Sequence, residues 1–364
     1  MSQTPTADSV LSRYGWTAEV QSQFDSLPPG ALLARVARVD RGGYLVATAG
    51  GVERCYSVGG ERDQAWIDSQ PVTGDWVAVR PEPGRGLVVE AVLPRRSAIK
   101  RLDPSETGEQ VLVANVDTMF ILHGLDRPHK VGRVERLCLI TLDAGAVPVV
   151  VLTKSDLEGT DDAAIDLLEA IDEVANVVRD VDIVPVSSTS GSGIHQLAPY
   201  LLPGHTVGLV GESGAGKSTL INRLAGDEVQ ETGDTREGDS MGKHTTTSRH
   251  LVPLPSGAVL IDTPGLRAVS MLGDQTGLEQ SYADVEDLFE LCRFRDCSHG
   301  AEPGCGVKEA LASGELEEAR WASYQGLLRE MAFEAARTDA RARNAEIKQL
   351  SKRIRKSKKN LDEW

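Results

Sequence analysis

Short apolar runs separated by turn residues occupy the chain from about residue 31 to residue 93. The turns are marked by pairs such as Gly42-Gly43, Gly50-Gly51 and Pro83-Gly84. Five short strands at this spacing are typical of a small barrel or sandwich. A five-stranded OB-type barrel fits this length, and the pattern leaves an SH3-like barrel open as well. The runs are ALLARVARV, GYLVATA, VERCYSV, DWVAVR and LVVEAVL.

Longer apolar runs alternate with helix-like segments from near Val111 to about Leu272. The clearest helical segments are 161–176 and 217–225. Continuous apolar strands that alternate with helices predict a parallel sheet covered on both faces. The runs are VDTMFILHGL, VPVVVLTKSD, VDIVPVSS, TVGLVGES and AVLIDTPG.

Both ends of the chain have a different character. The first 30 residues are polar and end in Pro28-Pro29-Gly30, which predicts a flexible arm with a short helix around Trp16 to Phe24. Beyond Leu272 the pattern is helical. We therefore predict a multi-domain chain with a flexible arm, an all-β OB-type barrel, an α/β domain and a mostly α-helical domain. Their ranges are 1–30, 31–100, 101–272 and 273–364.

Charge is distributed unevenly along the 364 residues. The net charge of −15 argues at first against a nucleic-acid partner. Between Arg337 and Lys359, however, ten lysines and arginines accompany only two acids, so this segment carries a charge of +8. Such asymmetry predicts a basic arm on an acidic body. No run of 18 apolar residues exists, and the N-terminus lacks the pattern of a secretory signal. We expect a cytoplasmic protein without a membrane partner.

A glycine-rich segment after the run TVGLV matches the pattern G-x-x-x-x-G-K-[ST], and a helix-like stretch follows it. In this context the backbone N–H groups of the loop face phosphates, and the helix N-terminus adds its dipole. Lys217 would neutralise β- and γ-phosphate charge, and the Ser218 hydroxyl would hold Mg²⁺. The predicted phosphate contacts are Gly211, Glu212, Ser213, Gly214, Ala215, Gly216, Lys217, Ser218 and Thr219.

Two further segments fit the same phosphate site. Asp262 ends the run AVLI, where a carboxylate can reach Mg²⁺ through water, and the N–H of Gly265 can sense the γ-phosphate. Between the loop and Asp262 lies His244, followed by three threonines. One of Thr245, Thr246 and Thr247 would complete the Mg²⁺ coordination. The sequence does not show which of the three threonines binds magnesium, and we take Thr246 as the candidate.

Guanine recognition is indicated by two weaker motifs. Thr153-Lys154-Ser155-Asp156 ends an apolar run, and Ser187-Ser188 ends the next one. The carboxylate of Asp156 can accept both N–H groups on the guanine edge, which adenine does not offer, and the stem of Lys154 can lie over the base. The familiar pattern is N-K-x-D, so Thr153 stands in place of asparagine. Backbone groups of Ser187 and Ser188 would contact the guanine oxygen.

The order of these motifs is reversed from that of ordinary GTPases, where the phosphate loop comes first. Here the guanine motifs precede it, which predicts a circularly permuted P-loop GTPase. No glutamine follows Gly265, because Leu266 stands there, and an apolar side chain cannot orient the attacking water. Intrinsic hydrolysis should therefore be slow, and His244 is the best local candidate for a catalytic residue.

A cluster of cysteines and one histidine lies within fourteen residues. The four residues Cys292, Cys297, His299 and Cys305 supply three thiolates and an imidazole at short spacing. This ligand set suits one structural, tetrahedral Zn²⁺ ion. A zinc knuckle followed by a basic helix favours contacts with a phosphate backbone. The isolated cysteines, Cys55 and Cys138, are expected to be buried.

The three parts together resemble the ribosome small-subunit-dependent GTPase family (RsgA, also called YjeQ). The resemblance covers about residues 31–310 and rests on GESGAGKST, KHTTT, DTPG and CRFRDCSHGAEPGC in that order. It implies an OB barrel, a permuted GTPase and a zinc knuckle in a factor that binds the immature small ribosomal subunit and its rRNA near the decoding region. It also implies hydrolysis of GTP to GDP for release, and it assigns the water-orienting role to His244. We expect a monomer.

Three alternatives remain. The first is a permuted GTPase of the large subunit, against which the barrel and the knuckle argue. The second is a zinc-containing RNA-binding module whose nucleotide site is only structural. The third is a P-loop ATPase or small-molecule kinase, against which Asp156 argues.

Overall fold

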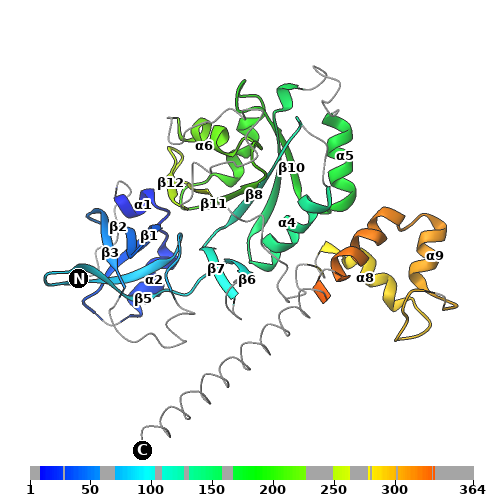
Figure 1. Cartoon of the computed structure of the whole chain (residues 1–364), viewed down its shortest axis with the longest axis horizontal. Coiled ribbons are helices and arrows are strands. Elements are labelled where there is room, and N and C mark those ends of the chain that lie inside the picture. Colours follow the sequence, from blue (N-terminus) through cyan, green and yellow to red (C-terminus); the bar gives the residue numbers. More distant parts are fainter. Residues whose placement is uncertain are drawn as a thin grey trace, which may run out of the picture. The chain divides into compact units, whose positions relative to one another are not determined.

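The computed structural model describes residues 9–27, 29–57, 70–102, 109–126, 131–157, 167–226, 249–262, 278, 281–300, 302–329 and 331–332. The chain divides into two compact units. One consists of residues 1–99 and 111–268, and the other of residues 100–110 and 269–364. The boundaries predicted at residues 30, 100 and 272 stay a prediction. Figure 1 shows both units, with elements such as β11 and α8 labelled.

The first five strands form a closed barrel in the order β1-β2-β3-β5-β4. All neighbours are antiparallel except β3 and β5, which are parallel. Side chains such as Val36, Val46 and Val77 fill the interior together with the buried Cys55. The barrel is therefore OB-like, which resolves the choice between the two barrel types. Its strands are β1 Leu32–Asp40, β2 Gly43–Thr48, β3 Gly51–Tyr56, β4 Trp76–Glu82 and β5 Gly86–Val92.

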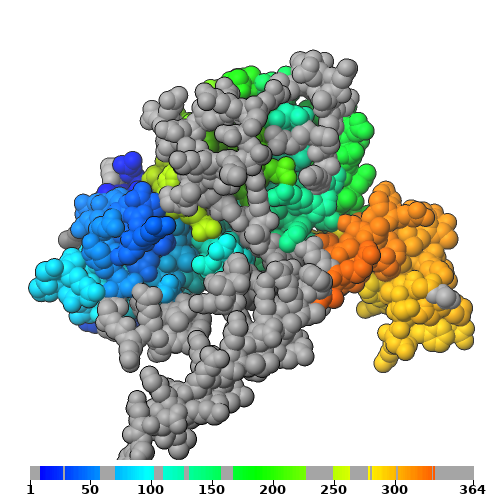
Figure 2. All heavy atoms as spheres, in the orientation of Figure 1, coloured from blue at the N-terminus to red at the C-terminus, as the bar shows by residue number. Residues whose placement is uncertain are grey.

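Two short helices precede the barrel, α1 (Val10–Arg13) and α2 (Ala18–Asp25). Leu11 and Val20 are buried in one apolar cluster with barrel residues that include Trp76. Figure 2 shows this N-terminal part as one packed body in blue to cyan. The short helix predicted around Trp16 to Phe24 corresponds to α2, and Leu11 and Val20 pack on the barrel. The flexible arm over residues 1–30 stays a prediction. Residues 1–8 lie outside the described part.

The second sheet has six strands in the order β10-β9-β8-β11-β13-β12. All neighbouring pairs are parallel except β13 and β12. Phe120, Leu122 and Leu209 pack with α6 and η2 in one apolar cluster, whereas the alternate residues Met119 and Ile121 are buried on the other face. The strands are β8 Thr118–Gly124, β9 Val147–Thr153, β10 Asp182–Val186, β11 Thr206–Gly211, β12 Leu251–Pro253 and β13 Val259–Asp262.

Helices connect these strands (Figure 1). The helix predicted over 217–225 is α6, and the one predicted over 161–176 is described as α5 over Leu167–Val177. One helix between β8 and β9, α4, was not predicted. The helical elements are α4 Val131–Asp143, η1 Ser155–Leu157, α5 Leu167–Val177, η2 Ile194–Tyr200 and α6 Lys217–Ala225.

A buried arginine joins the barrel to this sheet. Arg35 on β1 donates hydrogen bonds to the carbonyl oxygens of Tyr14 and Gly74 and to the Thr206 hydroxyl, 2.7 Å away. Its guanidinium lies over the ring of Trp76. Burial lowers the pKa of Arg35 to about 10. Because Thr206 is the first residue of β11, this contact holds the strand that leads into the phosphate loop.

The second unit is helical where it is described, apart from residues of a small two-stranded sheet. Helix α8 precedes the cysteine cluster, α9 follows it, and a third helix covers residues 318–329. Among the described residues no helix is long and apolar enough to cross a membrane. The basic segment 337–359 lies outside the described part. Its helices include α8 Ala283–Glu290 and α9 Gly306–Ser313. The strands of the small sheet are β6 Ala98–Leu102 and β7 Glu109–Ala114, of which residues 98–99 and 111–114 belong to the first unit.

Candidate nucleotide site and metal centre

The predicted nucleotide residues gather at one edge of the six-stranded sheet. Thr153 ends β9, Gly211 ends β11 and Asp262 ends β13, while Ser187 directly follows β10. The carboxyl ends of parallel strands lie at the same edge, which is where open α/β sheets bind ligands. The central strand β11 lies between β8 and β13. The guanine motifs and the phosphate motifs therefore meet in space although their order along the chain is permuted.

The phosphate loop has the geometry that its glycines allow. Gly214 and Gly216 have φ angles of 77° and 82°, in the left-handed region that favours glycine. The ammonium of Lys217 donates to the carbonyl oxygens of Gly211 and Glu212, at 2.8 and 2.7 Å. Helix α6 begins at Lys217, and its N-cap residue Gly216 provides no side-chain cap. The loop and the helix N-terminus thus form a site for an anion.

Thr153 connects the guanine motif to this loop. Its hydroxyl lies 2.9 Å from the carbonyl oxygen of Ala215 and 3.2 Å from that of His123, and it can donate to either. The side chain is buried. Lys154 adopts a φ of 63° and pairs with Asp126 at 2.5 Å. Asp156 lies in η1 and is exposed, so its carboxylate is accessible to a ligand.

Ser187 and Ser188 form a tight loop after β10. The N–H of Ser187 donates to the carbonyl of Ser192, and the Ser187 hydroxyl accepts from the N–H of Ser190. The hydroxyl oxygen of Ser188 is buried, and among the described residues it has no hydrogen-bond partner. A buried polar atom without a partner is costly, so this hydroxyl is suited to a bound group.

The switch residues lie outside the described part of the chain. These are His244, Thr245, Thr246, Thr247 and Gly265. Two neighbours of the site were missed by sequence reasoning, namely Asp126, which pairs with Lys154, and Arg133 on α4. Arg133 pairs with Glu212 of the phosphate loop at 2.6 Å. An acidic residue in a phosphate loop indicates that a basic side chain lies near it, but the sequence alone does not identify that side chain as Arg133.

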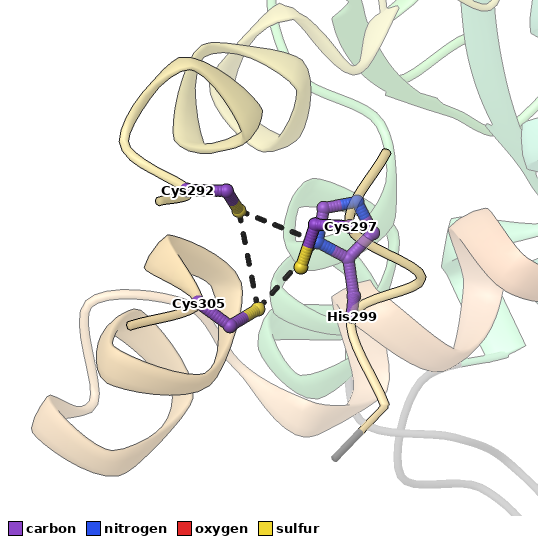
Figure 3. A group of neighbouring side chains, drawn as sticks. All are labelled: Cys292, Cys297, His299 and Cys305. Atoms are coloured by element: carbon purple, nitrogen blue, oxygen red, sulfur yellow. Dashed lines mark hydrogen bonds between the residues drawn. The ribbon is translucent and has the colours of Figure 1, made fainter. Parts of the chain in front are cut away.

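The four residues predicted to bind zinc come together in the second unit. Their ligand atoms all lie within 4.8 Å of one another (Figure 3). The sulfur of Cys292 lies 4.0 Å from that of Cys305, and the Nδ1 atom of His299 lies 3.6 and 3.5 Å from these two sulfurs. Ligands of a tetrahedral zinc ion are separated by about 3.5 to 3.8 Å, given Zn–S and Zn–N bonds of about 2.3 and 2.0 Å. The Cys₃His cluster therefore fits a zinc site.

The ligand loop is held by neighbouring groups. His299 has a φ of 58° and stacks on Phe289 with ring centroids 4.3 Å apart. The carboxylate of Glu302 accepts hydrogen bonds from the backbone N–H groups of Ser298 and Gly300, on either side of the histidine. Burial lowers the pKa of His299, which favours the neutral imidazole that binds a metal.

The sheet order and the site define a class of protein, a circularly permuted P-loop GTPase. Family comparison agrees. The family model described as RsgA GTPase matches residues 92–272. A second model, described as ABC transporter, matches residues 194–353. That match includes the phosphate loop, which ATP- and GTP-hydrolysing families share, but it excludes the Thr153 motif.

Individual relatives extend the match to nearly the whole chain. The small ribosomal subunit biogenesis GTPase RsgA of Streptomyces avermitilis is 46% identical over 350 residues, which are 94% of this chain and 91% of the relative. The solved structure of YjeQ from Thermotoga maritima has a TM-score of 0.59 at 26% identity, covering 83% of this chain and 99% of that one. YloQ, described as a circularly permuted GTPase, has a TM-score of 0.58 at 21% identity, covering 84% and 96%. The chain belongs to the RsgA GTPase family, and it is a GTP hydrolase.

Proposed function

We propose that this GTPase assists the late maturation of the small ribosomal subunit and that hydrolysis of GTP to GDP and phosphate drives its release. One observation carries the GTPase part of the proposal: the sheet brings a guanine motif, a phosphate loop and an acid at the end of β13 to a single edge in permuted order. The assignment to the small subunit is supported by the Streptomyces avermitilis relative, which is a small ribosomal subunit biogenesis GTPase by name.

Nucleotide binding is assigned to residues at that edge. Asp156 accepts from the guanine edge, and the backbone of Ser187 and Ser188 contacts the guanine oxygen. The N–H groups of the phosphate loop and Lys217 hold the phosphates. Magnesium would be held by the hydroxyl of Ser218 and reached through water by Asp262. Mg²⁺ with GTP therefore completes the site.

Hydrolysis needs residues of the switch segments. We assign the orientation of the attacking water to His244, metal coordination to one of Thr245, Thr246 and Thr247, with Thr246 as the candidate, and sensing of the γ-phosphate to the N–H of Gly265. Leu266 has no polar group that could orient a water. Slow intrinsic turnover and stimulation by the ribosomal partner are the consequences.

The zinc module and the basic segment provide the RNA-binding part of the proposal. One Zn²⁺ ion, held by the Cys₃His cluster, is structural, because four protein ligands leave no open position for catalysis. The ten basic residues between Arg337 and Lys359 supply charge for contacts with the rRNA backbone. We propose a cytoplasmic monomer.

The test is GTP hydrolysis by the purified protein with small subunits, with large subunits or with neither. We expect strong stimulation by small subunits alone, and loss of that stimulation in His244→Ala while the variant still binds GTP. Stimulation by large subunits would reassign the target. Absence of stimulation by either would instead support an RNA-binding module whose nucleotide site is structural.

A further inference from the structure

The second position of the phosphate loop is acidic. From Gly211 to Ser218 the loop contains two charged side chains, Lys217 and Glu212. Phosphate loops bind anions through backbone N–H groups and a lysine, so a carboxylate on the loop opposes the potential that attracts a polyphosphate. If this chain binds GTP, the charge of Glu212 has to be compensated.

Helix α4 supplies the compensation. Arg133 lies in its first turn, and the Nη1 atom is 2.6 Å from Oε1 of Glu212. The two side chains are only 34% and 26% exposed, so solvent screens this pair less than it screens a fully exposed one. The N-terminus of α4 also carries a partial positive charge, which favours the same carboxylate.

Glu212 is held through its backbone as well. The ammonium of Lys217 donates to its carbonyl oxygen at 2.7 Å. The carboxylate is thus fixed by Arg133 and the carbonyl by Lys217. Rotation of this residue would break both contacts and would also turn the N–H groups that follow it in the loop.

We propose that Arg133 is a positioning residue for nucleotide phosphates. It neutralises the carboxylate of Glu212 and holds it against α4, so that the loop presents positive potential to a nucleoside di- or triphosphate. The inference rests on the proposed GTP-binding function and adds a residue to that site. Its consequence is a charge dependence: loss of Arg133 weakens the binding of a triphosphate more than that of a diphosphate.

The test measures the affinities of GDP and a non-hydrolysable GTP analogue for the full chain, Arg133→Ala, Glu212→Gln and the double variant, at low and high salt. We expect Arg133→Ala to weaken binding of the analogue about tenfold and binding of GDP about threefold at low salt, since the analogue brings one more phosphate charge to a loop whose carboxylate has lost this ion pair. High salt should reduce both losses. Glu212→Gln should return the Arg133→Ala protein to within about twofold of the original affinities, because it removes that carboxylate.

Asp126→Asn is the matched control. Asp126 also forms an ion pair at this site, but its partner is Lys154 of the guanine motif, at 2.5 Å. This variant should lower the affinities for GDP and for the GTP analogue by the same factor. Equal losses for the two nucleotides in Arg133→Ala, or no recovery in the double variant, would overturn the inference. Stimulation of the unaltered protein by small subunits would then leave the proposed function standing, so the two failures are distinguishable.

Discussion

The hydroxyl of Thr153 lies 2.9 Å from the carbonyl oxygen of Ala215, within the phosphate loop. The two residues belong to strands β9 and β11 and their loops, which are separated in the sheet by β8. A side chain of the guanine motif thus bonds directly to the loop that faces the phosphates. Threonine, which stands where the familiar motif has asparagine, still makes this bridge.

Replacing Thr153 by valine should weaken guanine nucleotide binding. Valine keeps the shape and removes the hydroxyl, leaving the buried carbonyl oxygen of Ala215 without this donor. A lost hydrogen bond of this kind costs about 1 kcal/mol, so we expect a loss of affinity of about fivefold. Titration of the variant with a fluorescent GDP analogue measures it. Thr153→Ser keeps the hydroxyl and serves as the control, and an equal loss in both variants would exclude a role for the bridge.

Replacing Asp156 by asparagine should change the base that the site selects. The asparagine oxygen still accepts from N1–H, but its amide now points a donor at the guanine amino group. Xanthine has a carbonyl at that position and would accept from the amide. We expect GTP affinity to fall about 100-fold and XTP to bind better than GTP, measured by calorimetry. Asp172→Asn, an exposed position on α5, is the control, and unchanged base preference in Asp156→Asn would place the guanine site elsewhere.

Replacing Arg35 by methionine should destabilise the first unit. The change removes hydrogen bonds to Tyr14, Gly74 and Thr206. The Gly74 carbonyl keeps a second donor, the Asn115 amide, whereas the Tyr14 carbonyl and the Thr206 hydroxyl lose the guanidinium as a donor. We expect the free energy of unfolding to fall by about 3 kcal/mol. Arg54→Met is a matched control on the same barrel, because the Arg54 side chain is 51% exposed and its ion pair with Asp40 is long, at 3.7 Å. That variant should change the stability by less than about 0.5 kcal/mol. Chemical denaturation compares the two, and similar losses would contradict a special role for Arg35.

The features that could be predicted from the sequence are the strands and the metal cluster, because each is determined by the residue pattern of a short stretch of chain. Alternating apolar runs with glycine turns identified all five barrel strands, and continuous apolar runs identified five of the six strands of the sheet. The Cys/His spacing identified a cluster whose atoms lie together. In each of these cases the signal lies within a short stretch of chain.

Contacts between distant segments could not be predicted in this way. Arg35 and Thr206 are 171 positions apart, and Arg133 and Glu212 are 79 positions apart. A polar residue in a strand or helix can be exposed to solvent or buried against a polar partner. Only the tertiary packing determines which of the two occurs. The N-terminal segment is a similar case. Leu11 and Val20 pack on the barrel, but two isolated apolar residues in a polar segment do not predict this packing.

Removal of zinc should unfold the second unit and leave the first intact. Cys292 follows the C-cap of α8, Cys297 and His299 lie in the loop after it, and Cys305 is the N-cap of α9. The three cysteines form no disulfide, so the zinc ion would be the bond that joins these segments. Structural zinc sites contribute their binding free energy directly to folding. We expect one zinc ion per chain in the original protein and none in Cys297→Ser, measured by elemental analysis. Trp321 lies 5.7 Å from the His299 ring, so its fluorescence should change on chelation.

The control for the metal experiment is Cys55→Ala, since Cys55 is buried in the barrel interior and far along the chain from the cluster. This variant should keep its zinc and its response to chelators. Because the guanine and phosphate motifs belong to the first unit, Cys297→Ser should still bind GDP with the affinity of the original protein, while losing helical circular dichroism and small-subunit-stimulated hydrolysis. Loss of GDP binding together with zinc would instead mean that the metal module supports the nucleotide site, and retained zinc in Cys297→Ser would remove this cysteine from the ligand set.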